Sequence, residues 1–349
     1  MTIYEELQLN QIGSKNLIKQ SKDKKEKIRH ILIYILKVLI TLLFCITFVT
    51  IFTTIFGSEN GITGVVVLLF LLVFRQSDFN IKASHSIINM FIIFTILAIS
   101  PYIASISSPA ISLLINFISI LLLVILSCHN VNLFNHSTVI LCYLLLFGYE
   151  AEGKIYIMRI LGLMFGAILC SIIIYRHTIK KQYEKGIKNF FSEFDIKIDR
   201  SKWQISLAFA ISSAIFFAQL FNFQRVMWVG FSVLSISQIS PELRTKRAIA
   251  RIPGTFLGVA LFYILYKIVP NQYHSMFGLL GGLLVGFSAT YSMQTTFNCL
   301  GALYSAIDIL EIKGVIIFRI INTIFGVLYG LLFHFIFDKI HLKYTNKKV

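Results

Sequence analysis

Long apolar runs recur along this 349-residue chain, and they constrain its fold more than any other feature. Hydrophobic residues make up 56% of the sequence, and an α-helix needs about 20 apolar residues to cross the hydrocarbon core of a bilayer. Because lipid offers no hydrogen bonds, each crossing segment must satisfy its own backbone, which a helix does. The sequence therefore predicts an all-α polytopic membrane protein that contacts membrane lipid, and it excludes a soluble globular domain.

Twelve segments are apolar enough to be expected as transmembrane helices, six on each side of a basic linker. They are residues 31–56, 62–75, 83–102, 108–127, 137–149, 155–175, 204–222, 226–240, 248–269, 273–288, 292–308 and 314–337. Several are short, and merging the pairs 137–149 with 155–175 and 273–288 with 292–308 would reduce the count to ten.

The polar segments divide the chain into five expected parts. These are a basic N-terminal segment (1–30), a first six-helix repeat (31–175), a basic amphipathic linker (176–203), a second six-helix repeat (204–337) and a basic tail (338–349). The linker interleaves Lys and Arg with aromatic residues, which favours an interfacial helix on anionic lipid over a nucleic-acid site. No nucleic-acid partner is expected.

The distribution of basic residues orients the chain. The formal net charge is +16, and placing the N-terminus in the cytoplasm puts every basic cluster on the cytoplasmic side. This satisfies the positive-inside tendency of membrane proteins. We expect both termini to be cytoplasmic.

An internal repeat is visible near the end of each half. The stretch IYIMRILGLMFG, residues 155–166, aligns with VIIFRIINTIFG, residues 315–326, and Arg159 falls on Arg319. Six spans are an even number, so the two halves share one orientation and should be related by an axis along the membrane normal. Such duplication is typical of a transporter.

Arg159 and Arg319 each lie four or five residues inside the outer end of the last helix of their half, roughly 6 to 8 Å into the membrane. One interpretation is that the long side chains snorkel to the outer headgroups. The positive-inside tendency disfavours arginine here, however, and the same residue occurs in both halves. We therefore favour an anion-binding or gating pair that faces the bundle interior.

The stretch RTKRAIAR, residues 244–251, precedes Pro253, which we expect in the first turn of a helix. A helix amino end attracts anions through its free N–H groups. The cluster is either a positive-inside anchor or a cytoplasmic vestibule for an anionic substrate.

Two G-x-x-x-G steps, Gly254 to Gly258 and Gly326 to Gly330, let neighbouring helices approach closely. Helix packing is the favoured interpretation over a substrate path.

Three residues are candidates for proton coupling. Asp308 and Glu311 lie near the outer end of a span, and His334 lies deep in the last one. A titratable group inside a membrane protein can carry a coupled proton. The alternatives are loop carboxylates and a packed, hydrogen-bonded histidine.

The sequence contains none of three common catalytic or nucleotide-binding motifs. It lacks G-x-x-x-x-G-K-[ST], H-E-x-x-H and G-x-S-x-G, which would support phosphate binding, zinc proteolysis and acyl transfer. We expect no enzyme activity, no cofactor and no metal site.

Two related motifs carry a family resemblance. They are R-x-x-G-T-x-x-G at Arg251, Gly254, Thr255 and Gly258, and R-x-x-N-T-x-x-G at Arg319, Asn322, Thr323 and Gly326. Together with the six-plus-six pattern, they resemble the fusaric acid resistance protein-like, or aromatic acid exporter, family of bacterial inner-membrane proteins. This chain looks like a small-format member without the large cytoplasmic domains.

The resemblance implies export of aromatic or other organic anions, as in multidrug resistance, beside a periplasmic membrane-fusion adaptor protein and often as a dimer. It marks Arg251, Thr255, Arg319 and Asn322 as candidate substrate-binding or gating residues. The sequence thus predicts an inner-membrane efflux component driven by the proton gradient. A passive anion channel and a non-transport scaffold of a secretion complex are the alternatives.

Overall fold

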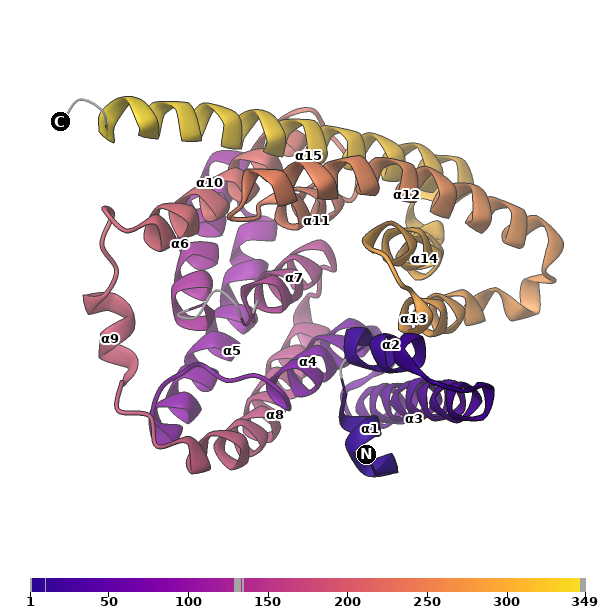
Figure 1. The fold of residues 1–349 in the computed structure, drawn as a ribbon. Helices are drawn as coiled ribbons and strands as arrows, with labels where there is room; N and C mark the ends of the chain where they lie inside the picture. The colour runs from indigo at the N-terminus through magenta and orange to yellow at the C-terminus, as the bar shows by residue number, and fades with distance from the viewer. Residues whose placement is uncertain (1, 10, 129–132, 134, 346–349) are drawn as a thin grey trace. The chain divides into compact units, whose positions relative to one another are not determined.

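The computed structural model describes residues 2–9, 11–128, 133 and 135–345. Among these residues the regular secondary structure is all helical, with turns and irregular connections between the helices and no β-strand (Figure 1). The expected all-α fold class is confirmed.

The helices follow one another with short connections. In the N-terminal part they are α1 (Ile3–Gln8), α2 (Gln11–Gln20), α3 (Lys24–Phe56), α4 (Gly61–Phe74), α5 (Ala83–Ile106), α6 (Pro109–Ser127), α7 (Asn135–Gly148) and α8 (Gly153–Thr178). In the C-terminal part they are α9 (Ile187–Ser192), α10 (Asp199–Leu220), α11 (Met227–Ile236), α12 (Pro241–Ile268), α13 (Phe277–Phe287), α14 (Tyr291–Tyr304) and α15 (Ile307–Thr345).

Each of the twelve expected spans coincides with a helix, but the helices differ in length. Among the described residues, seven are long and apolar enough to cross a membrane: α3, α5, α6, α8, α10, α12 and α15. The other five, α4, α7, α11, α13 and α14, have 10 to 14 residues, or roughly 15 to 21 Å. The chain is a multi-pass helical membrane protein with seven full-length spans among the described residues by this criterion. The twelve-span arrangement stays a prediction.

The start of α12 corrects one expectation. Pro253 is not in a first helical turn, because α12 begins at Pro241 and runs through Pro253 to Ile268. Pro241 has the preformed φ angle that suits a first turn, and the Leu, Arg, Lys and Ala residues that follow are good helix formers. The cationic residues 244–251 therefore lie on the helix and do not precede it.

The linker also differs from the expected amphipathic helix over 176–203. Helix α8 continues to Thr178, a 3₁₀ turn covers Ile179–Lys181, and only the six residues of α9 are helical before α10 begins at Asp199. Gln182 adopts a left-handed backbone with φ 43°, which ends the helix that precedes it.

The chain forms two compact units, each of which takes helices from both halves of the sequence. The first unit comprises residues 1–48 and 253–316, and the second comprises residues 49–252 and 317–349.

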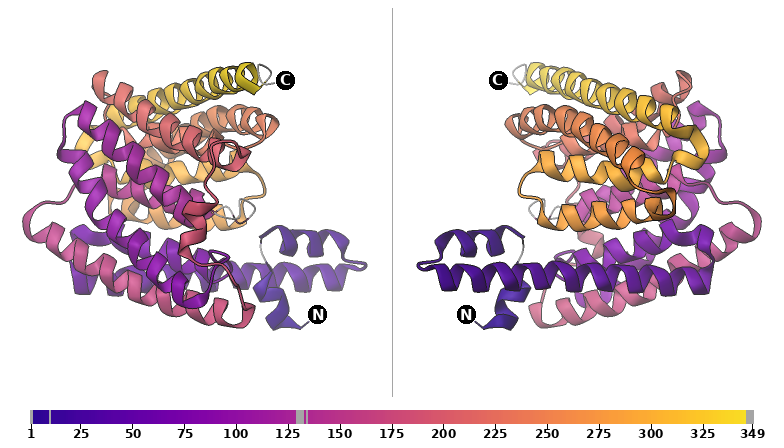
Figure 2. Two further views of the ribbon diagram at one scale, coloured as in Figure 1. Left: turned by 90° about the vertical axis from the view of Figure 1, so that its left-hand side faces the viewer. Right: turned by 90° about the vertical axis from the view of Figure 1, so that its right-hand side faces the viewer.

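In the first unit, α2 folds back along the beginning of α3 (Figure 2). Nδ1 of His30 lies 2.6 Å from Oε1 of Glu6, and both side chains are buried. Nζ of Lys37 donates to Oγ of Ser14 at 2.9 Å. On α2, Lys15 donates to the Ser288 carbonyl at 2.7 Å, so a cation lies at the carboxyl end of α13, where the helix dipole favours it.

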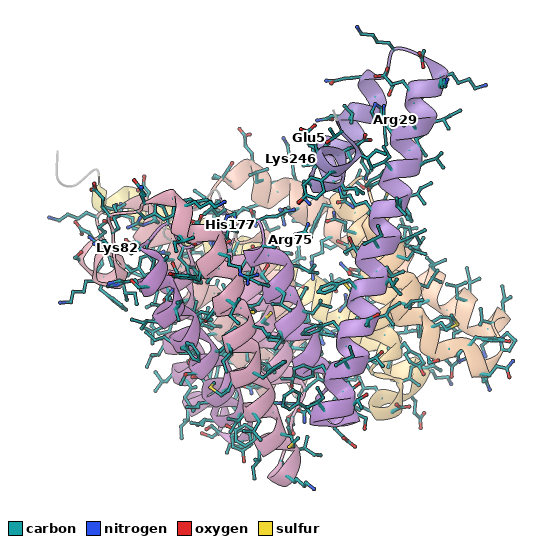
Figure 3. The ribbon with its side chains drawn as sticks, turned by 90° about the horizontal axis from the view of Figure 1, so that it is seen from below. Glu5, Arg29, Arg75, Lys82, His177 and Lys246 are labelled. Carbon is teal, nitrogen blue, oxygen red and sulfur yellow. The ribbon has the colours of Figure 1, made fainter. Side chains whose placement is uncertain are left out.

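In the second unit, α5 packs against α8 and α6 packs against α10. Aromatic side chains fill much of its interior, and Phe70, Phe74, Phe94, Tyr143 and Trp228 are fully buried. Figure 3 shows Arg75, Lys82, His177 and Lys246 toward the same end of this unit.

A buried carboxylate joins the α4–α5 connection to the start of the linker at that end. Oδ2 of Asp78 accepts from Nζ of Lys181 at 2.6 Å and from the hydroxyl of Tyr183 at 3.1 Å. Burial and the Asp78 charge raise the pKa of Tyr183 to about 12, so the phenol keeps its proton and remains a donor at physiological pH. We call Asp78, Lys181 and Tyr183 the linker clasp.

Helix α15 is interrupted at Glu311. Its backbone has φ 53° and ψ 168°, a region that only glycine adopts without strain. The chain bends there before the long apolar part of α15 begins.

Candidate functional site

Arg159 lies on α8 and is buried, with 4% of its surface exposed. Its Nη1 donates to the carbonyl of Tyr149 at 2.6 Å. Its Nε is buried and has no hydrogen-bond partner among the described residues. The side chain is therefore directed into the protein.

Arg319 lies on α15 and is also buried. Its guanidinium carbon is 5.1 Å from the centre of the Trp228 ring, within the range of a cation–π contact. Nε1 of Trp228 is buried and has no hydrogen-bond partner among the described residues. Both repeated arginines therefore lie in the interior of the second unit.

Asn322 follows Arg319 by one helical turn and is fully buried. Its Nδ2 donates to the carbonyl of Gln224 at 2.7 Å and to that of Arg225 at 3.2 Å. Its Oδ1 has no partner within the described part of the chain. The motif asparagine thus fixes the connection between α10 and α11 and leaves one acceptor unused.

Arg225, in that connection, completes the cluster. Its Nη1 donates to the Gly148 carbonyl at 3.1 Å, and its guanidinium carbon is 4.7 Å from the centre of the Tyr149 ring. Arg225 and Arg159 therefore both donate to backbone carbonyls at the carboxyl end of α7. The Arg225 carbonyl in turn accepts from Asn322. We call Arg159, Arg225 and Arg319, with Tyr149, Trp228 and Asn322, the arginine cluster.

Two physical roles are open to this cluster. Arg159 and Arg225 donate to carbonyls just at and beyond the carboxyl end of α7, where cations stabilise a helix. A guanidinium in an apolar interior is nevertheless costly, and such residues in membrane proteins usually mark a binding or transport path. The donor face of Arg159 that the helix end leaves unused could bind a carboxylate.

Arg251 is almost fully buried on α12, and its Nε donates to Oγ of Ser232 at 3.3 Å. A Cβ added to Gly326 would lie 2.7 Å from Cβ of Ser232, and one added to Gly330 would lie 2.6 Å from Cδ1 of Ile236. These motif residues therefore meet around α11 and hold α12 and α15 against it.

The other motif glycines lie in the first unit. A Cβ added to Gly254 would lie 2.8 Å from the Ser292 carbonyl oxygen, and one added to Gly258 would lie 2.5 Å from the Thr296 carbonyl oxygen. Thr255, between them, is buried with a hydroxyl that has no partner among the described residues. The face that contains both glycines packs on α14.

His334 is buried between Ser206 on α10 and Ser237, which directly follows α11. Its Nδ1 is 3.1 Å from Oγ of Ser206, and its Nε2 is 2.8 Å from Oγ of Ser237. Both ring nitrogens are satisfied within the second unit.

Asp308 and Glu311 are exposed; Asp308 lies in the first turn of α15, and Glu311 is the residue at which the helix bends. They belong to the first unit, whereas the arginine cluster and His334 belong to the second. Their assignment to proton coupling stays a prediction.

A comparison with known proteins identifies the segment that holds most of this cluster. Residues 213–333 match the fusaric acid resistance protein-like family. The match confirms the resemblance that the two sequence motifs indicated. No curated protein and no solved structure matches the chain significantly.

The matched segment covers about a third of the chain. It includes Arg225, Trp228, Arg319 and Asn322, while Arg159 lies outside it. Sequence reasoning missed Arg225, Tyr149 and Trp228. Arg225 carried a signal, because a cation in a connection that the topology places outside is uncommon.

Proposed function

We propose that this protein is an inner-membrane efflux component that exports organic anions, with aromatic carboxylates as the main class. The observation that carries the proposal is the buried guanidinium of Arg159 on α8, whose Nε has no hydrogen-bond partner among the described residues. The family match supports a transporter-like function in a membrane.

The chemistry of the arginine cluster suits such a substrate. A guanidinium pairs with a carboxylate through two parallel N–H donors. The rings of Tyr149 and Trp228 already lie against Arg225 and Arg319, so an aromatic ring would find both charge and a ring face here.

We also propose that the chain crosses the membrane as twelve helices in two parallel six-helix repeats, with both termini in the cytoplasm. The five short helices are compatible with this arrangement because short or broken spans are tolerated where protein covers them. The common end at which Arg75, Lys82, His177 and Lys246 lie supports the orientation.

In this proposal the proton gradient drives export, with Asp308, Glu311 or His334 as the coupling group. A periplasmic adaptor and a homo-oligomer, such as a dimer, complete the pathway across the envelope.

Transport into everted membrane vesicles tests the proposal, because export then appears as uptake of radiolabelled 4-hydroxybenzoate. We expect Arg159→Gln to reduce uptake at least tenfold, since the cation would be lost from the path. Arg75→Gln is the matched control, because Arg75 is exposed in the α4–α5 connection and its loss should leave uptake unchanged. Equal uptake by the two variants would refute the role of Arg159.

The driving force is tested in the same vesicles. Uptake that collapses when an uncoupler is added supports proton-driven export, whereas uptake that persists down the anion gradient identifies a passive channel. Absence of uptake under both conditions, with an adaptor still bound, identifies a scaffold.

A further inference from the structure

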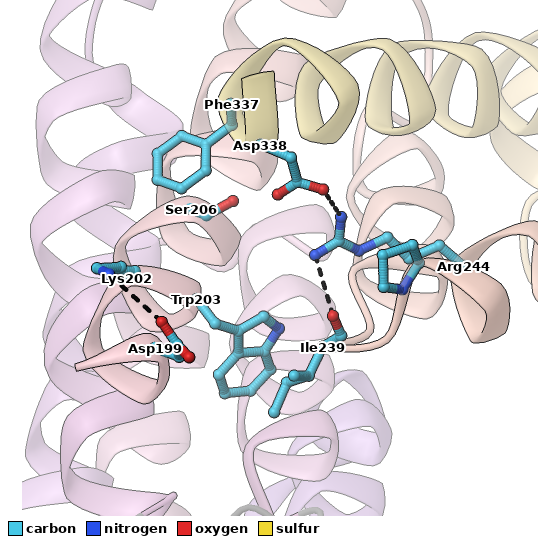
Figure 4. A pocket seen from close by; sticks show the side chains of 9 residues that line it. Asp199, Lys202, Trp203, Ser206, Ile239, Arg244, Phe337 and Asp338 are labelled. Atoms are coloured by element: carbon cyan, nitrogen blue, oxygen red, sulfur yellow. Dashed lines mark hydrogen bonds and ion pairs between the residues drawn. The ribbon is translucent and has the colours of Figure 1, made fainter. Parts of the chain in front are cut away.

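A pocket of about 370 Å³ lies at one end of the second unit, away from the arginine cluster. It is bounded by the first turns of α10 and α12 and by α15 close to Asp338 (Figure 4). Its lining includes Lys202, Trp203, Ser206, Arg244, Phe337 and Asp338. Arg225 follows the other end of α10, which is roughly 33 Å long for its 22 residues.

Two aromatic rings give the pocket its apolar walls. Figure 4 shows the hydroxyl of Ser206 between the rings of Trp203 and Phe337. Nε1 of Trp203 donates to the Ser237 carbonyl at 3.0 Å, so the indole is fixed in place. The volume is at the low end for small-molecule sites, which suits a ligand with one or two rings.

The two cations of the pocket differ in how they are held. The guanidinium of Arg244 donates to the Gln238 carbonyl at 2.5 Å, to the Ile239 carbonyl at 3.3 Å and to Oδ2 of Asp338 at 2.6 Å. Three of its five N–H groups are therefore engaged, one on each nitrogen, which holds the guanidinium in place as one wall of the pocket.

Lys202 is held more weakly. Its Nζ lies 3.3 Å from Oδ1 of Asp199, whose side chain is 94% exposed. An ion pair with so exposed a partner contributes little, so a ligand carboxylate can replace Asp199 at low cost. Lys202 and Ser206 are four residues apart on α10 and share one face of the helix.

The hydrogen bonds of His334 determine whether the Ser206 hydroxyl acts as a donor or an acceptor toward the pocket. Oγ of Ser237 donates its single hydrogen to the Val233 carbonyl at 2.8 Å, so it can only accept from Nε2 of His334. A neutral imidazole has one N–H, which leaves Nδ1 as an acceptor. Oγ of Ser206 therefore donates to Nδ1 and offers only its lone pairs to the pocket.

We propose that this pocket is the cytoplasmic loading site for an aromatic carboxylate that also carries a hydroxyl or amino group. The ring packs between Trp203 and Phe337, the carboxylate pairs with Lys202, and the hydroxyl or amino group donates to Ser206. The inference rests on the proposed function for its orientation, and it adds a second site and a required donor on the ligand.

The two tryptophans of the chain, Trp203 and Trp228, allow a direct test, because one lies in the pocket and the other in the arginine cluster. The probe is 4-hydroxy-3-iodobenzoate, whose heavy atom quenches indole fluorescence on contact. With purified full-length protein in detergent, we expect saturable quenching in Trp228→Phe, where all emission comes from Trp203. If Trp228→Phe does not fold, loss of quenching in Trp203→Phe relative to the parent protein gives the same answer.

Ligand and protein variants then test the polar contacts. We expect 3-iodobenzoate, which lacks the hydroxyl, to bind roughly tenfold more weakly. Lys202→Gln should weaken both probes about tenfold, and Ser206→Ala should remove the difference between them. Arg75→Gln is the control and should bind both probes as the parent does.

Three results would overturn the inference: saturable quenching of Trp228 alone, no saturable quenching of either tryptophan, or equal affinity for the two probes in the parent protein. The proposed function would fail on its own if the parent protein showed no uptake into vesicles although the probe still quenched Trp203.

Discussion

Close packing of α12 on α14 predicts a measurable cost for adding one methyl group at Gly258. A Cβ at this position would lie 2.5 Å from the Thr296 carbonyl oxygen and 2.8 Å from Cβ of Cys299. The backbone oxygen cannot move aside as a flexible side chain could. Nearby, Oγ1 of Thr296 donates to the Gly254 carbonyl at 3.0 Å, which holds the two helices at this distance.

Gly278 on α13 supplies a matched control. A Cβ added there would have no heavy atom within 4 Å. Replacing a helical glycine with alanine gains up to about 1 kcal/mol of helix propensity, and because both sites are helical most of this gain cancels between the two variants. Overpacking costs about 1–3 kcal/mol, and the free energy of unfolding of Gly258→Ala should be lower than that of Gly278→Ala by this amount.

Thermal unfolding of the two purified variants in the same detergent measures the difference. At about 2–4 °C per kcal/mol, Gly258→Ala should melt roughly 2 to 12 °C below Gly278→Ala. Equal melting temperatures, or a higher value for Gly258→Ala, would refute the close contact between α12 and α14.

Two further predictions concern buried polar groups of the second unit. Asp78→Asn removes the charge that Lys181 faces at 2.6 Å, and trypsin should cleave the linker several-fold faster because the linker clasp is weakened; an unchanged cleavage rate would show that the clasp does not hold the linker. Asn322→Ala removes two hydrogen bonds to the Gln224 and Arg225 carbonyls and should lower the free energy of unfolding by about 1–3 kcal/mol, which a denaturant titration would measure; a change below 0.5 kcal/mol would contradict it.

Helix positions were predictable where apolar runs end at clear polar boundaries. The run expected from residue 83 corresponds to α5, which starts at Ala83. Helix α11 was expected to reach residue 240 but ends at Ile236. The reason is tertiary, since Arg244 donates to the carbonyls of Gln238 and Ile239 and so satisfies them outside a helix.

The candidate site was predictable only in part. The internal repeat pointed to Arg159 and Arg319 because alignment of two similar stretches is a local property of the sequence. The contact between Arg225 and Tyr149 joins residues 76 positions apart, and no periodicity or spacing encodes such a pair. Trp203 and Phe337, which line the pocket, were equally unpredictable, because aromatic residues are abundant throughout the chain and nothing in the sequence distinguishes these two.

The strained backbone at Glu311 lowers local stability at a residue that is also a candidate for proton coupling. A glutamate with φ 53° and ψ 168° costs about 1–3 kcal/mol, which glycine would recover. Glu311→Gly should therefore be more thermostable than the parent, whereas Glu311→Gln keeps the strain and loses only the charge. If the carboxylate carries the coupled proton, both variants lose proton-driven uptake, and only Glu311→Gly gains stability. The residue at this position could then not be replaced to make the protein more stable without losing transport.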